Sequence, residues 1–222
     1  MNPGRHIRIL LTAIGLLLSL AKASAQEPVV KFWTWFQLNE NKLNRLAEEP
    51  VALLEELQAQ LLAVDSGLHI EIDAANHRSI TFTADGDERL FPVVQELLQK
   101  APLLANWKFT AFRQRLKSSE ISSLQLKMGD RLLGVDQLFF FPVAEKDSLD
   151  IIIYLPGLTT DNYMEMAYQC LILLDHLLGE YDCVMKVRHY DFHLLPRRKE
   201  ELADLKPLKE LPAFIDRFHI GK

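Results

Sequence analysis

The stretch LFFFPVAEKDSLDIIIYLPG, residues 138–157, decides the fold of this chain. Its two apolar runs, Leu138–Val143 and Leu149–Leu155, have the length of β-strands, and polar residues Glu145–Asp147 separate them. Pro156-Gly157 is a turn signal that ends the second run. The stretch therefore predicts a β-hairpin followed by a tight turn.

The residues after this hairpin predict a helix and a third strand. Apolar residues recur at helical spacing over about Thr160–Leu178, and Gly179 is typical of a helix C-terminal cap. Alternation over Cys183–Leu194 then indicates a strand. The predicted order is strand, strand, helix, strand.

The same order is predicted earlier in the chain. Leu68–Ala74 and Ser79–Ala84 alternate as a hairpin, a helix ends near Ala101, and a strand containing Trp107 follows. We therefore predict an α+β fold of two tandem ββαβ units, 67–117 and 118–196. These units are expected to form an antiparallel or mixed sheet with helices packed on one face.

Helical segments are expected to flank the two units. Residues 26–66 predict two helices, which Pro50 separates. Residues 197–222 predict a short amphipathic tail that covers sheet or an edge.

Residues 1–25 have the pattern of a secretory signal peptide. Arg5 and Arg8 precede the apolar run Ile9–Ala21, and Ala23-Ser24-Ala25 offers small residues for cleavage. The alternative is an uncleaved membrane anchor. The apolar run of about 13 residues is short for an anchor, because about 20 apolar residues are needed to cross a bilayer. The pattern favours cleavage, a periplasmic or secreted protein, and no stable membrane insertion afterwards.

The charge of the chain disfavours some partners. Removing residues 1–25 takes away three basic residues and no acidic one, so the formal charge changes from −5 to −8. Binding to nucleic acid or to anionic lipid needs the opposite sign. The expected partner is therefore a protein or a small molecule in the periplasm, and not a nucleic acid.

His189, Asp191 and His193 form the most suggestive chemical pattern. Residues at i, i+2 and i+4 share one face of a strand, and two imidazoles with a carboxylate suit zinc or iron. The alternative is that this face simply emerges from the core into water. A metal-dependent hydrolase is one hypothesis that this pattern supports.

Carboxylates suggest a second chemistry. Glu40, Asp85 and Glu180 would serve an acid–base hydrolase if they met across a cleft. The alternative is that Asp85-Gly86-Asp87 caps a helix and that Glu180 lies in a solvated loop. The capping interpretation is favoured.

The aromatic stretch Phe32–Phe36 is a candidate binding patch. Trp33 and Trp35, with the polar neighbours Asn39 and Glu40, would stack on a sugar or anchor a partner protein. The alternative, which we favour, is that these rings pack the first helix onto the sheet.

Cys170 and Cys183 either form a disulfide or remain two buried thiols. Cys170 lies about two helical turns, roughly 12 Å, before the helix end, which is too far for a bridge to a strand beginning beside that end. The sequence therefore favours two free thiols and provides no nucleophile with an activating neighbour.

Arg113, Arg115 and Lys117 alternate at the end of a predicted strand. Such residues bind a carboxylate or form a solvated edge that discourages strand pairing. We expect the solvated edge.

Several phrases together carry a family resemblance: Phe32-Trp33-x-Trp35-Phe36 with Asn39-Glu40, Ala84-Asp85-Gly86, Ala101-Pro102 with Trp107, and Gly179-Glu180-Tyr181-Asp182. With these phrases the chain resembles an uncharacterised family of bacterial secreted proteins, a domain of unknown function. The resemblance implies a bacterial, periplasmic protein and carries no catalytic residues with it. The first hypothesis is a binding or interaction module without catalysis, and the second is a periplasmic hydrolase.

Overall fold

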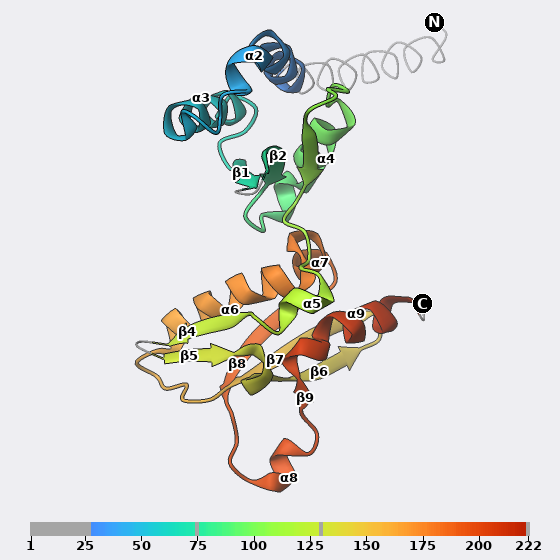
Figure 1. The fold of residues 1–222 in the computed structure, drawn as a ribbon. Coiled ribbons are helices and arrows are strands. Elements are labelled where there is room, and N and C mark those ends of the chain that lie inside the picture. Colours follow the sequence, from blue (N-terminus) through green and yellow to red (C-terminus); the bar gives the residue numbers. More distant parts are fainter. Residues whose placement is uncertain (1–27, 74–75, 129–130, 221–222) are drawn as a thin grey trace, which may run out of the picture. The chain divides into compact units, whose positions relative to one another are not determined.

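The computed structural model describes residues 28–73, 76–128 and 131–220, and it confirms an α+β protein (Figure 1). The chain divides into two compact units, with the boundary between Ala111 and Phe112. This boundary lies a few residues before the predicted one at 117. The predicted signal peptide, residues 1–25, lies outside the described residues.

The first unit combines a small sheet with several helices. It contains a helix over residues 28–38, α2 (Glu40–Leu43), α3 (Pro50–Leu62), β1 (His69–Asp73), β2 (Asn76–Thr83), η1 (Glu88–Leu90), α4 (Phe91–Gln99) and β3 (Lys108–Ala111). Strand β2 is the centre of the sheet, because it pairs antiparallel with β1 and parallel with β3. Helix α4 makes the crossover that a parallel pair requires.

Aromatic rings fill the core of the first unit. Phe32, Trp33 and Phe36 of the first helix are buried, and Trp33 meets Phe82 and Phe109 with ring centroids 5.7 and 4.7 Å apart. The indole Nε1 of Trp33 donates to the backbone oxygen of Leu97 at 2.8 Å. The N-terminal helix therefore belongs to the core of this unit.

The second unit contains the rest of the described chain. Its elements are α5 (Ser118–Ile121), β4 (Gln125–Met128), β5 (Arg131–Gly134), η2 (Val135–Gln137), β6 (Phe139–Glu145), β7 (Ser148–Leu155), α6 (Tyr163–Leu178), α7 (Glu180–Met185), β8 (His189–Leu194), α8 (Lys199–Leu202), β9 (Lys206–Pro207), η3 (Leu208–Glu210) and α9 (Leu211–Ile220). The hairpin β6–β7 is antiparallel and β8 runs parallel to β7, so the main sheet has the order β8-β7-β6-β9. Strands β4 and β5 form a sheet of their own.

The expectation of one sheet shared by both halves is wrong. The described strands form three hydrogen-bonded sheets, of three, two and four strands. Each large sheet has its own hydrophobic core to cover one face, so neither needs to extend into the other.

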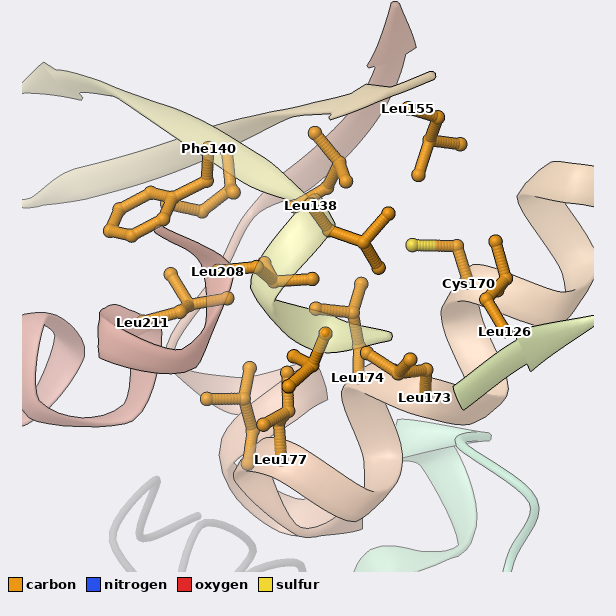
Figure 2. Close-up of a cluster of buried hydrophobic side chains, with 14 of the residues drawn as sticks. Leu126, Leu138, Phe140, Leu155, Cys170, Leu173, Leu174, Leu177, Leu208 and Leu211 are labelled. Carbon is orange, nitrogen blue, oxygen red and sulfur yellow. The ribbon is translucent and has the colours of Figure 1, made fainter. Parts of the chain in front are cut away.

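The core of the second unit lies on one face of its four-stranded sheet. Helices α6 and α9 lie on this side (Figure 1). Figure 2 shows Cys170, Leu173, Leu174 and Leu177 of α6 gathered with Phe140 of β6 and with Leu208 and Leu211. These side chains are at most 3 % exposed. The core of the unit therefore buries the inward face of the sheet.

The predicted strand Cys183–Leu194 is only half correct. Gly179 ends α6 as predicted, but with φ 76° and ψ 150° it leads at once into a second short helix, α7. The Glu180 side chain is fully buried, and its Oε2 accepts the backbone N–H of Arg113 at 3.2 Å. This hydrogen bond to a residue 67 positions away favours helix α7, whereas the local alternation of apolar residues had indicated a strand.

The expectation of a solvated edge at Arg113 and Arg115 is also wrong. Arg113 pairs with Asp175 at 3.4 Å, and Arg115 pairs with Asp182 at 2.9 Å and Asp216 at 2.8 Å. All three acids come from helices of the second unit, so these cations fasten residues 113–116 to α6, α7 and α9. Of these three basic residues only Lys117 is exposed, and it directly precedes α5.

We predict that Gly179→Ala destabilises the chain by about 1–3 kcal/mol, because this backbone conformation is nearly restricted to glycine. An added Cβ would also lie 3.0 Å from Arg115 N and 3.1 Å from Arg113 O. Urea unfolding measures the loss. The exposed α6 variant Glu165→Ala is the control, and equal stability of the two variants would contradict the prediction.

We predict a pH-dependent effect for Arg115→Gln. The hydrogen bond from Arg115 lowers the pKa of Asp216, so its stabilising contribution is present above about pH 4 and is lost as pH falls through the lowered folded value. The difference in free energy of unfolding between wild type and variant should therefore narrow between pH 4 and pH 2. An unchanged difference would contradict this. Arg198→Gln, which removes an exposed pair with Glu201, should change little at any pH.

Candidate functional site: the open face of the second sheet

The outward face of the four-stranded sheet in the second unit is the candidate functional surface. Nine residues on β6, β7 and β8 point away from the core, and none of them is buried. We call this surface the open face: Phe139, Phe141, Val143, Asp150, Ile152, Tyr154, His189, Asp191 and His193.

Strand register orders the open face into three rows across the sheet. The first row is Phe139, Tyr154 and His193, and the second is Phe141, Ile152 and Asp191. The third row is Val143, Asp150 and His189. Apolar groups therefore occupy β6 and the centre of β7, while polar groups occupy β8 and one end of β7.

Two apolar side chains of the open face are more than one third exposed. Phe141 is 37 % exposed and Val143 is 39 % exposed. Their chain neighbour Phe140 points the other way and is fully buried. Neighbouring exposed apolar side chains are typical of a surface that another molecule covers.

The carboxylates of the open face already have partners. Arg188 donates through Nε to Asp150 Oδ1 at 2.8 Å, and this guanidinium holds the pKa of Asp150 below its usual range. His193 Nε2 lies 2.8 Å from Asp191 Oδ2, and this hydrogen bond lowers the pKa of Asp191. Both carboxylates of the open face are thus hydrogen-bonded within the unit.

The structure places His189, Asp191 and His193 on one face of β8 but does not gather them around a point. Four residues of strand separate the two histidines by roughly 13 Å along the backbone at about 3.3 Å per residue. The carboxylate of Asp191 instead forms a local hydrogen bond: its Oδ1 accepts the backbone N–H of Phe192 at 2.9 Å. Across 28–73, 76–128 and 131–220, no group of three or more His, Cys, Asp or Glu is arranged to hold a metal ion.

The edge of this sheet beside β6 is covered over a short length only. Strand β9 is two residues long, pairs with Phe139 and Phe140, and contains Pro207, which has no N–H to donate.

The three predicted acid–base residues lie in different settings. Glu180 is fully buried in the second unit, where it is part of the fold. Glu40 and Asp85 belong to the first unit, and Asp85 Oδ2 lies 3.3 Å from His69 Nε2. Asp87 caps η1 by accepting the N–H of Arg89 at 3.1 Å, as the capping interpretation expects.

The predicted aromatic patch is corrected by burial. Trp33 is 4 % exposed and packs in the core, so it is not a surface anchor. Trp35 is half-buried, and its backbone oxygen accepts the side-chain N–H of Asn39 at 2.8 Å. The favoured alternative, in which this stretch packs the first helix onto the sheet, is correct.

Both thiols are free and buried, which confirms the favoured prediction. Cys183 lies on α7 and not on a strand, and Tyr190 Oη donates to its backbone oxygen at 3.0 Å. Burial raises the pKa of each thiol to about 12. Neither is a thiolate at neutral pH, so neither serves as a nucleophile.

Sequence reasoning missed the apolar half of the open face. Its signal was present in Leu138–Phe141, where apolar residues are consecutive and do not alternate. A strand with one wet face normally alternates. The consecutive rings are therefore the sequence signal for a β6 strand that is apolar on both faces.

Comparison with known proteins finds no matching family model, no similar curated protein and no similar solved structure. In the described part of the chain, no helix has the length and apolar character that a membrane span requires. The functional argument therefore rests on the open face itself.

Proposed function

We propose that the chain is an exported bacterial binding module that recognises a protein partner through the open face of its second unit. The observation that carries the proposal is the exposed pair Phe141 and Val143 beside Ile152, on the face of the sheet that the core does not use. Contact with an apolar partner surface would remove these side chains from water.

The arrangement of polar groups favours a protein over a charged ligand. A protein interface usually combines an apolar area with polar groups at its margin, and the open face has apolar groups on β6 and the centre of β7 with polar groups along β8. Because Asp150 pairs with Arg188 and Asp191 is hydrogen-bonded to His193, both carboxylates of the face already have partners within the unit. The negative charge of the mature chain likewise disfavours nucleic acid.

We also infer that the chain arose from two tandem ββαβ units. The order β1, β2, α4, β3 in the first unit matches β6, β7, α6, β8 in the second. In each case the first pair is antiparallel and the last strand joins the second in parallel. The same strand order and pairing in both units support this inference. After such a duplication, the second unit would be free to specialise in binding.

Photocrosslinking in the cells that naturally make the protein tests the binding proposal. The full chain carries photoreactive benzoylphenylalanine in place of Phe141. We expect a discrete adduct with one protein of different mass. The second substitution Ile152→Lys should reduce its yield about tenfold or more, because it places a charge at the centre of the contact.

The matched control carries the same photoreactive group at Tyr168 on α6. Tyr168 is 64 % exposed, so non-specific capture would favour it over position 141. Equal adducts from both positions, no adduct from position 141, or an adduct only with a second copy of the chain would each contradict the proposal. Circular dichroism confirms that the Ile152→Lys chain is folded.

A further inference from the structure

The outer side of helix α6 carries a second apolar surface, separate from the open face. Met164 is 79 % exposed, Tyr168 is 64 % exposed, and Leu171 and Ile172 are each 41 % exposed. These positions are spaced i, i+4, i+7 and i+8, so the four side chains lie on one side of the helix. We call this surface the α6 stripe.

The opposite side of α6 is apolar as well. Met166, Cys170 and Leu174 lie on that side and are buried in the core of the second unit. A helix that is apolar on all sides is normally covered on all sides. The core covers only the inner side of α6, so its sequence is suited to a further contact on the outer side.

Helix α4 shows that the fold does not require an apolar outer side. It follows the hairpin of the first unit, as α6 follows the hairpin of the second. The exposed residues of α4 are Pro92, Gln95 and Gln99, and none of them is a large apolar residue. The α6 stripe is therefore a particular feature of the second unit.

The charged residues around the α6 stripe favour a second copy of the chain in antiparallel orientation. Exposed Asp161 and Glu165 lie at the N-terminal end of α6, which contains no Lys or Arg. The C-terminal end carries exposed His176 and also Arg113, which is 3.4 Å from Asp175. A two-fold axis through the middle of the stripe places each acidic end against the Arg113 and His176 end of the other copy. The dipoles of the two helices then also run in opposite directions.

We propose that two copies of the chain associate through an antiparallel pair of α6 helices, with Tyr168 and Leu171 of both copies at the centre. Contact between the two stripes would remove eight apolar side chains from water. An anionic lipid surface is a less suitable partner, because the flanking carboxylates and the net charge of −8 on the mature chain would repel it.

The size of this contact predicts a weak, reversible dimer. Helix α6 has 16 residues and is therefore about 24 Å long. A stable interface buries about 800 Å² on each partner, which is more than one helix with four exposed apolar side chains provides. We therefore expect association at micromolar and not at nanomolar concentration.

The dimer would leave the open face accessible. Helix α6 packs on the inward face of the four-stranded sheet, and the open face is the outward one (Figure 1). Either proposal can therefore fail without the other. A photoreactive group at Tyr168 would give an adduct of twice the chain mass, which its mass distinguishes from the adduct expected at position 141.

Sedimentation velocity of the full mature chain, from micromolar to millimolar concentration, tests the dimer. We expect the average mass to rise from one chain to two and to fall again on dilution. Leu171→Glu should weaken the dimer about tenfold or more, because the two-fold axis buries a carboxylate from each copy. The matched control Leu132→Glu makes the same change at a 60 % exposed position on β5 and should leave the dimer unchanged.

A charge exchange tests the antiparallel orientation. The double variant Asp161→Lys/Glu165→Lys and the single variant His176→Glu should each form a weaker homodimer than wild type. An equimolar mixture of the two should restore association, because lysines of one copy then face Glu at position 176 of the other.

Circular dichroism and urea unfolding establish that each variant is folded. The proposal is overturned if the wild-type chain remains monomeric at every concentration, or if Leu132→Glu dissociates the dimer as much as Leu171→Glu. A mixture of the charge variants that associates no better than either variant alone would overturn the antiparallel pairing.

Discussion

The structure of the second unit depends on burial of one face of a sheet and not the other. Phe140, Ile151, Ile153 and Leu155 project inward, where α6 and α9 cover them. A strand has only two faces, so this choice fixes where Phe141, Ile152 and Asp191 must lie. A one-residue change in register would exchange the two sets and bury two carboxylates. The register of β6, β7 and β8 therefore determines both which side chains form the core and which form the open face.

The polar contacts around Gly179 hold the helices in the position that this core requires. Arg115 joins α7 and α9 through Asp182 and Asp216, and Glu180 holds the backbone of Arg113. These groups are partly or fully withdrawn from water, where each charge needs a partner. Such carboxylates serve architecture, and Glu180, one of the acids that attracted notice in the sequence, is among them.

Local patterns in the sequence were sufficient for the two longer hairpins and the main helices. Alternation and apolar runs predicted β1–β2 and β6–β7, and the glycine after Leu178 marked the end of α6, but the short β4–β5 hairpin was not predicted. What failed required knowledge of distant partners. The alternation from Cys183 indicated a strand, but Arg113, some seventy residues earlier, stabilises a helix there. Arg115 was expected in water for the same reason, since Asp216 lies 101 residues away.

The candidate sites were predicted less well than the fold, for physical reasons. A shared strand face does not by itself bring i and i+4 side chains to one point, and the described structure does not gather His189 and His193 as the metal hypothesis requires. The consecutive aromatic residues Phe139–Phe141 of β6 can be recognised in the sequence. The proposed function depends on this feature.

The adjacent residues Phe140 and Phe141 allow the most direct test, because they are chemically identical and point to opposite faces of β6. Urea unfolding of Phe140→Ala and Phe141→Ala should give very different losses of stability. The account predicts about 3–5 kcal/mol for Phe140→Ala and about 1 kcal/mol or less for Phe141→Ala. Comparable losses would mean that the fold itself covers the open face, and this would contradict its assignment as a binding surface.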